Sequence, residues 1–189
     1  PSKPDLSDPA HNTYSAIILA GGEGKRAGGA DKGFVLHRGA PLIEHVIATI
    51  APQVDDIIIS ANRNIERYQG YGYQVIRDND DIRQGPLSGM LACLPACRHE
   101  RVLVVPCDMP NLPDGLVDRL GSVNSADISI AELDSQLQLA MIVRRSLAPS
   151  IEAALDNDEL SLMRWVKSCN YHSVTFAERS RFTNLNEGS

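Results

Sequence analysis

Short runs of apolar, β-branched residues recur along the chain, and segments whose apolar residues repeat at helical spacing separate them. Continuous apolar runs of this kind are typical of strands that are buried on both faces of a sheet. They predict strands over 14–19, 34–37, 56–60, 73–77, 101–106, 127–132, 138–143 and 171–176. The periodic segments predict one helix that Pro41 opens and Pro52 ends, and further helices over 87–97, 114–120, 146–155 and 161–167.

Strands that alternate with helices predict an α/β fold, in which helices cover both faces of a mostly parallel sheet. The strands at 127–132 and 138–143 are separated only by a polar turn at Asp134-Ser135, so this pair is expected to be antiparallel and the sheet mixed. A chain of 189 residues corresponds to about one domain. We therefore expect a single domain at 13–189, after a disordered polar tail at 1–12.

Composition and charge exclude several classes of function. The net charge is −6 and no stretch forms a concentrated basic patch, which argues against a nucleic-acid partner. No apolar run approaches the ~20 residues needed to cross a bilayer, and the polar first twelve residues do not resemble a signal peptide. The four cysteines form no Cys-x-x-Cys pair. A reduced, cytoplasmic protein with no membrane partner is therefore expected.

Polar or glycine-rich segments directly follow three of the predicted strands. They begin after Leu19, after Ile59 and after Pro106. Ligands of open α/β sheets bind at the carboxyl ends of the strands. We therefore expect these segments, which are far apart in the sequence, to converge in space.

The first of these segments has the composition of a phosphate-binding loop. Five glycines fall between Gly21 and Gly29, and Lys25, Arg26 and Lys32 lie among or just after them. Glycines let the backbone N–H groups approach an anion closely, and the cations neutralise its charge. The loop therefore predicts a site for a diphosphate or triphosphate.

Two common phosphate motifs match this loop poorly. A P-loop needs a glycine at the position of Leu19 and a hydroxyl residue at the position of Arg26. The dinucleotide-binding fingerprint is met only in its looser form, by Gly22, Gly24 and Ala27, and no helix is predicted to begin there.

A longer pattern fits better: Leu19-Ala-Gly-Gly-x-Gly-x-Arg26-x-Gly-Gly-x-Asp31-Lys32-Gly33. It resembles the signature of nucleotidyltransferases with a three-layer, Rossmann-like fold, and in particular that of the molybdenum cofactor guanylyltransferases of the MobA type. Further segments are similar to that family, in family order and along nearly the whole chain: Ala61-Asn-Arg63, Val75-Ile-Arg-Asp78, Gly85-Pro-Leu-Ser-Gly89, Pro106-Cys-Asp-Met-Pro110 and Phe182-Thr-Asn-Leu-Asn186.

The resemblance implies an Mg²⁺-dependent transfer of GMP from GTP to the terminal phosphate of molybdopterin, the organic part of the molybdenum cofactor. The product would be the guanine dinucleotide cofactor, with pyrophosphate as leaving group. GTP and molybdopterin would then be the small-molecule partners, and cofactor-delivery proteins or apo-molybdoenzymes the protein partners.

The family pattern also implies the catalytic residues. Lys32 would contact the GTP phosphates and Arg26 would stabilise the leaving pyrophosphate, since arginine binds phosphate in a bidentate manner. Asp108 would be the Mg²⁺ ligand, because Mg²⁺ prefers one or two carboxylates together with phosphate oxygens. Cys107 beside it is interpreted as a packing residue.

The residues that the resemblance assigns to nucleotide binding are Leu19, Ala20, Gly21, Gly22, Gly24, Lys32, Ser60, Asp78, Gly85, Gly89 and Asp108. Asp78 could accept hydrogen bonds from guanine N1–H and N2–H₂ or from the ribose, and the sequence leaves both open. Ser60 stands where relatives often carry asparagine. Asn184 and Asn186 would orient the pterin or its phosphate.

Two alternatives stay open at this point. The chain could be a related nucleotidyltransferase that uses CTP or another phosphate acceptor. It could also be a non-catalytic protein that holds a nucleotide or delivers the cofactor. An Asp108→Ala variant separates the second alternative from an enzyme, because a binding protein has no need of the metal carboxylate.

Overall fold

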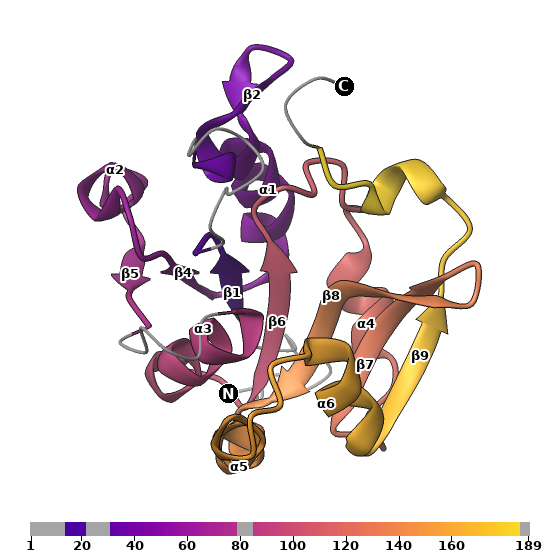
Figure 1. The fold of residues 1–189 in the computed structure, drawn as a ribbon. Coiled ribbons are helices and arrows are strands. Elements are labelled where there is room, and N and C mark those ends of the chain that lie inside the picture. Colours follow the sequence, from indigo (N-terminus) through magenta and orange to yellow (C-terminus); the bar gives the residue numbers. More distant parts are fainter. Residues whose placement is uncertain (1–13, 22–30, 79–84, 186–189) are drawn as a thin grey trace, which may run out of the picture.

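The computed structural model of the protein describes residues 14–21, 31–78 and 85–185, so the tail expected at 1–12 lies outside the described residues. Within these ranges a seven-stranded sheet has the order β5-β4-β1-β6-β8-β7-β9 (Figure 1). Its strands are β1 (Ser15–Leu19), β4 (Asp56–Ser60), β5 (Gln74–Ile76), β6 (Arg101–Pro106), β7 (Ile128–Leu133), β8 (Gln136–Arg144) and β9 (Tyr171–Thr175).

The sheet is mostly parallel, and β8 is the strand of this sheet that runs against the others. The antiparallel β7–β8 pair is the one that the sequence predicts. Its turn residues Asp134 and Ser135 have positive φ values of 49° and 63°, as a tight hairpin with the native strand twist requires. The mixed sheet of the prediction is therefore confirmed.

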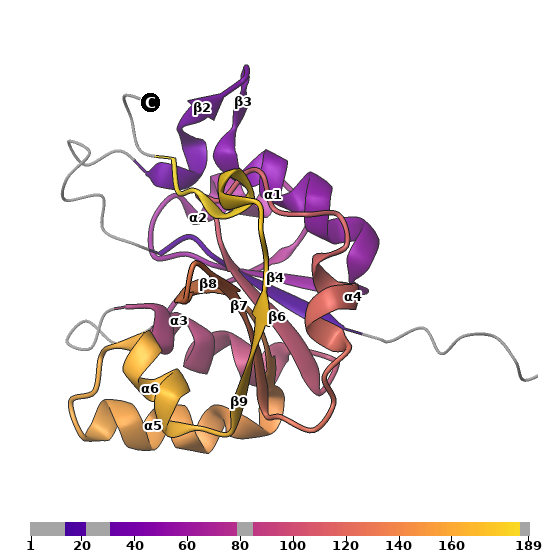
Figure 2. The ribbon, with the colours of Figure 1, turned by 90° about the vertical axis from the view of Figure 1, so that its right-hand side faces the viewer.

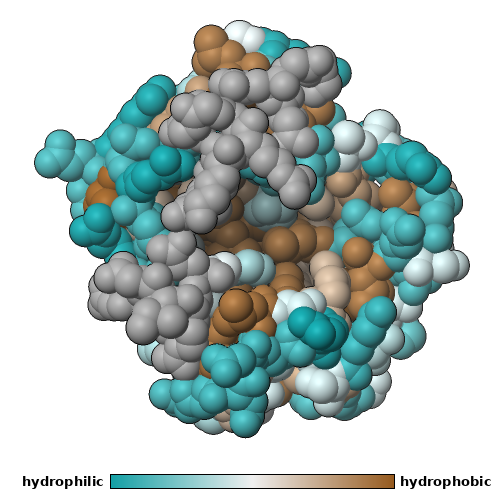
Figure 3. All heavy atoms as spheres, in the orientation of Figure 1, coloured by the Kyte–Doolittle hydropathy of each residue, from teal (hydrophilic) through white to brown (hydrophobic). Residues whose placement is uncertain are grey.

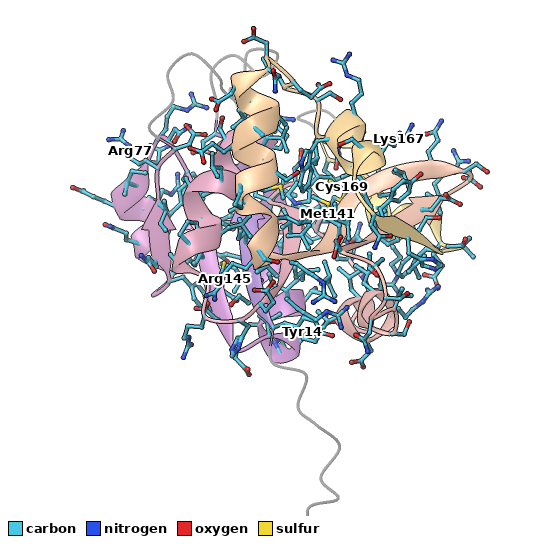
Figure 4. The ribbon with its side chains drawn as sticks, turned by 90° about the horizontal axis from the view of Figure 1, so that it is seen from below. Tyr14, Arg77, Met141, Arg145, Lys167 and Cys169 are labelled. Carbon is cyan, nitrogen blue, oxygen red and sulfur yellow. The ribbon has the colours of Figure 1, made fainter. Side chains whose placement is uncertain are left out.

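Helices cover both faces of this sheet, as Figure 2 shows. The helices α1 (Leu42–Ile50) and α4 (Leu116–Gly121) pack on one face, and α3 (Pro86–Cys93), α5 (Ala148–Asp156) and α6 (Leu162–Ser168) pack on the other. Successive residues of β1 point to opposite faces, so Ile18 joins the first apolar cluster and Ile17 the second. In the view from below, Met141 of β8 lies between α5 and α6, and it belongs to the same apolar cluster as their buried residues (Figure 4). The three layers confirm the predicted α/β fold.

The segment at 34–37 is not one strand, which corrects the prediction. Phe34 belongs to a 3₁₀ turn, Lys32–Phe34, and the strand β2 is confined to Leu36–His37. The turn forms because the Asp31 carboxylate accepts a hydrogen bond from the Gly33 N–H at 3.2 Å. β2 then pairs with β3 (Ala40–Pro41) in a small separate hairpin.

Two helical segments also differ from the prediction. The helix expected over 87–97 ends at Cys93, and Leu94–Ala96 continues as a 3₁₀ turn. Pro95 lacks a backbone N–H, and its ring clashes with the carbonyl four residues earlier, so the α-helical pattern cannot continue. The helix α2 (Ile65–Gln69) was not predicted, because its five residues are too few to show a helical repeat.

The order of the strands determines where a ligand can bind. From β1 the chain leads to β4 on one side, whereas β6 flanks β1 on the other side. Such a reversal of strand order opens a crevice at the carboxyl ends of the strands. In the part of the chain that the structure describes, no helix has the length and hydropathy of a membrane span.

Ile58 of β4 provides a test of the two-sided core. Its side chain is fully buried in the cluster beneath α3. We expect Ile58→Ala to lower the free energy of unfolding by about 2–5 kcal/mol, since it leaves a cavity, and Ile58→Val to lower it by about 0.5–1.5 kcal/mol. Urea denaturation measures both. Equal stability of the Ala variant and the wild type would contradict this packing.

Candidate functional site

The loops that follow β1 and β6 are fixed to the neighbouring strand ends at their first residues. Ala20 N donates to Ser60 O at 2.8 Å, and Cys107 N donates to Leu19 O at 3.1 Å. The parallel hydrogen-bond ladder thus continues past the strand ends. It gives these two loops a rigid common base.

A cavity of about 530 Å³ opens at this edge of the sheet, a volume in the usual range for ligand pockets. It is lined by nine residues that the sequence assigns to nucleotide binding: Leu19, Ala20, Gly21, Lys32, Ser60, Asp78, Gly85, Gly89 and Asp108. Pro86, Pro106, Cys107 and Leu139 complete the lining. Apolar surface is visible in the hollow at the centre of this face (Figure 3). Segments far apart in the sequence therefore converge here.

The positions of four predicted site residues relative to the cavity are not described. Gly22, Gly24, Arg26 and Asn186 lie outside the described residues. Asn184 is described, and it is not among the residues that line the cavity. Its neighbour Leu185 donates its backbone N–H to Asp108 O at 3.0 Å, and Phe182, buried against Phe176, holds the same segment in place. Asn184 therefore lies next to the loop that carries Asp108.

Lys32 and Asp108 meet at the cavity. The Lys32 Nζ lies 3.4 Å from Asp108 Oδ2, and the two side chains are 38% and 9% exposed. An ion pair with such an exposed lysine contributes little to folding stability, about 0–1 kcal/mol. The arrangement therefore presents a partly exposed cation and a buried carboxylate to the cavity.

The first turn of α3 closes against the ends of β1 and β4. A Cβ added at Gly89 would lie 2.7 Å from Ser60 Oγ and 3.1 Å from Leu19 Cδ2. Before the helix, Gly85 has a φ of 148°, which side chains rarely tolerate. Glycine at these two positions lets backbone, rather than side chains, form this wall of the cavity.

Asn62 is a site residue that the sequence analysis missed. Its Nδ2 donates to Asp78 Oδ1 at 2.9 Å, and its Oδ1 accepts from Asp78 N at 3.1 Å. This reciprocal pair fixes the orientation of the Asp78 carboxylate at the cavity. Asn62 lies within the family-like segment Ala61-Asn-Arg63, so the motif marked the position without revealing its contact.

The thiol of Cys107 is unsuited to nucleophilic chemistry. Burial raises the pKa of this thiol far above its usual value, and the negative charge of Asp108 raises it further. Cys93 on α3 behaves in the same way, since burial raises its pKa to about 12. Both thiols stay protonated at neutral pH, and the interpretation of Cys107 as a packing residue is consistent with this burial.

A family model and two curated relatives agree on one family. A family model described as the MobA-like NTP transferase domain matches residues 16–174. The molybdenum cofactor guanylyltransferase of Shewanella putrefaciens is 42% identical over 176 residues, which cover 90% of both chains. That of Photobacterium profundum is 40% identical over 94% of this chain and 93% of its own.

Solved structures share the fold at lower identity. Molybdopterin-guanine dinucleotide biosynthesis protein A from Archaeoglobus fulgidus aligns with a TM-score of 0.72 and 22% identity, over 93% of each chain. A protein from Aquifex aeolicus VF5 aligns with a TM-score of 0.77 and 22% identity, over 92% of this chain and 94% of its own. These likenesses support the fold.

The contact of Gly89 with Ser60 predicts an overpacked variant. We expect Gly89→Ala to destabilise the protein by about 1–3 kcal/mol, because the new methyl group would overlap Ser60 Oγ. Adding Ser60→Gly should recover part of this loss, as the overlapping atom is removed. Gly115→Ala is the matched control, since a Cβ there meets nothing within 4 Å. Urea denaturation of these variants checks the prediction, and equal effects at Gly89 and Gly115 would refute it.

The raised pKa of Cys107 predicts its reactivity. At pH 8 a thiol whose pKa is raised is protonated, so we expect iodoacetamide to leave Cys107 unmodified in the folded protein. The partly exposed Cys169 should react first. Mass spectrometry of digested samples measures the order of labelling, and urea-unfolded protein is the control in which both react. Rapid labelling of Cys107 in the folded state would contradict its burial.

Proposed function

Because the chain belongs to the MobA-like NTP transferase family, and within it to the molybdenum cofactor guanylyltransferases, we propose that it transfers GMP from GTP to the terminal phosphate of molybdopterin. Pyrophosphate leaves, and the product is the guanine dinucleotide form of the cofactor. One observation carries this proposal: Lys32 Nζ lies 3.4 Å from Asp108 Oδ2 at a cavity that is also lined by Gly21, Gly85 and Gly89.

The chemistry needs alignment and charge neutralisation more than proton transfer. An oxygen of the acceptor phosphate attacks the α-phosphorus of GTP, a new P–O bond forms, and the bond to pyrophosphate breaks. The acceptor is already an anion, so a strong general base is unnecessary. The Lys32 ammonium group neutralises charge on the GTP phosphates at the cavity. Arg26, outside the described residues, is assigned to the leaving pyrophosphate.

The nucleoside of GTP is assigned to a part of the cavity away from Lys32. We assign the base to the wall that Leu19, Ala20, Gly21, Gly85 and Gly89 line, because glycines there allow it to approach the backbone closely. Asp78 accepts hydrogen bonds there, from the guanine N1–H and N2–H₂ groups or from the ribose.

Two polar side chains support this assignment. Asn62 holds the Asp78 carboxylate in one orientation. Ser60, almost fully buried, forms part of the floor of the cavity.

The residues present fit a divalent cation bound together with substrate. Among the described residues no cluster of three or more His, Cys, Asp and Glu side chains could hold a metal ion on its own. Asp108 is a nearly buried carboxylate on the cavity wall, and Mg²⁺ is usually held by one or two carboxylates plus substrate phosphates. We assign Mg²⁺ to Asp108. When bound, it would supply neutralisation of the negative charge on the phosphates.

The acceptor is assigned to the side of the C-terminal segment. Leu185 donates its N–H to the backbone of Asp108, so Asn184 is the neighbour of a residue hydrogen-bonded to the proposed metal ligand, which supports this assignment. The neutral amides of Asn184 and Asn186 would orient the pterin or its phosphate without adding charge.

The experiment measures pyrophosphate release by the purified protein with molybdopterin and Mg²⁺. GTP, CTP, ATP and UTP are supplied one at a time. We expect release with GTP alone. Release with CTP would keep the mechanism and overturn the base assignment, and silence with all four would refute the transferase proposal with this acceptor.

Asp108 variants test the assigned metal ligand. We expect Asp108→Ala to lower turnover by at least about 100-fold, because the carboxylate that binds the metal is lost. Asp108→Asn keeps the shape of the side chain and should lose a similar factor. The exposed Asp118 on α4 is the matched control, and Asp118→Ala should keep wild-type turnover. Full activity of Asp108→Asn would contradict the assignment.

A further inference from the structure

Three hydrogen bonds converge on the carboxylate of Asp31, the residue before Lys32. The Tyr68 hydroxyl donates to Oδ1 at 2.5 Å, and the Gly33 N–H donates to the same oxygen at 3.2 Å. Asn64 Nδ2 donates to Oδ2 at 2.9 Å. Both oxygens of this carboxylate are therefore used within the protein. Asp31 is also absent from the described residues that line the cavity.

The turn that carries Lys32 is packed against the same tyrosine. Tyr68 of α2 is fully buried, and the Phe34 ring stacks on it with the centroids 4.4 Å apart. The Arg67 guanidinium also lies over the Phe34 ring, 3.6 Å from its centroid. A Cβ at Gly33 would overlap the Tyr68 hydroxyl, so only glycine allows this approach. The helix α2 thus packs against the turn Lys32–Phe34 at Gly33 and Phe34.

The contact between Lys32 and Asp108 is too weak to hold the lysine in place by itself. Its N···O distance is 3.4 Å and the lysine side chain is 38% exposed, so its contribution is small. Hydrogen bonds to an ionised carboxylate are stronger, and the Tyr68–Asp31 bond is short. The position of the Lys32 backbone is therefore determined by Asp31 and its partners rather than by the ion pair at the cavity.

We propose that Tyr68 and Asn64 are positioning residues of the transfer reaction, which act through Asp31 to hold Lys32 beside Asp108. This inference rests on the proposed role of Lys32. Tyr68 suits the task because burial, and then its hydrogen bond to Asp31, raise the pKa of its hydroxyl. It stays a neutral donor over the pH range in which the protein is folded.

The test is a double-mutant cycle on turnover with GTP and molybdopterin. Tyr68→Phe removes the hydroxyl and keeps the ring that stacks on Phe34. We expect it to lower kcat/KM roughly 10- to 100-fold, since small misplacements of a catalytic group cost factors of this size. In a Lys32→Ala background the same change should have almost no further effect, because Tyr68 acts through Lys32. A merely structural role of Tyr68 would instead give additive losses and overturn the proposal.

A matched control comes from a nearby tyrosine. The Tyr71 hydroxyl donates to Glu44 Oε1 at 3.0 Å, also a bond from tyrosine to carboxylate, and Tyr71 lies outside the cavity lining. Tyr71→Phe should therefore leave kcat/KM unchanged. An equal loss in both variants would overturn the proposal. Should Tyr68→Phe fail to fold, Asp31→Asn keeps the shape of the side chain and removes the charge, and the same cycle is run with it.

A structural readout separates this inference from the proposed function. In a crystal structure of Tyr68→Phe, we expect Lys32 to have moved away from Asp108, beyond the 3.4 Å of the wild-type pair. This measurement needs no activity, so it still decides the inference if the wild-type protein transfers no guanylyl group. Lys32 in its wild-type position would overturn the proposal even if the transfer activity is established.

Discussion

The hydrogen-bond ladder of the parallel sheet is the constraint on which the rest of this structure depends. Parallel strands end at one edge, and here the ladder extends one residue beyond β1 and β6, because Ala20 N donates to Ser60 O at the end of β4 and Cys107 N donates to Leu19 O. The polar loops consequently start from fixed points. Every later feature of the site, from the glycine wall of α3 to the Lys32–Asp108 pair, is placed relative to that edge.

The parts of the fold that the sequence predicts well are those governed by burial. The runs at 56–60 and 101–106 coincide with β4 and β6, because a strand covered on both faces must be apolar throughout. The turn at Asp134-Ser135 marks the antiparallel pair, because two left-handed residues need polar or glycine side chains there. The family-like motifs that begin at Leu19 and Pro106 locate cavity-lining residues for a related reason, since they start at the ends of the buried strands β1 and β6.

The contacts that the sequence does not reveal are those between side chains of separate loops. Nothing local to Asn62 shows that it pairs with Asp78, because the pairing depends on β4 and β5 lying side by side. Tyr68 belongs to a helix too short to leave a periodic pattern, and its hydroxyl reaches a carboxylate 37 residues earlier in the chain. Such contacts follow from tertiary packing, which residue spacing does not encode.

The loop after β4 links two parts of the site. Asn62 contacts Asp78, and Asn64, two residues later, contacts Asp31. One short stretch of backbone therefore links the Asp78 carboxylate at the cavity to Asp31, the residue before Lys32. An insertion or deletion in this stretch would move both contacts at once, whereas the exposed turn after α5 can change length without affecting either. The gain or loss of a residue during evolution is thus tolerable in one loop and disabling in the other.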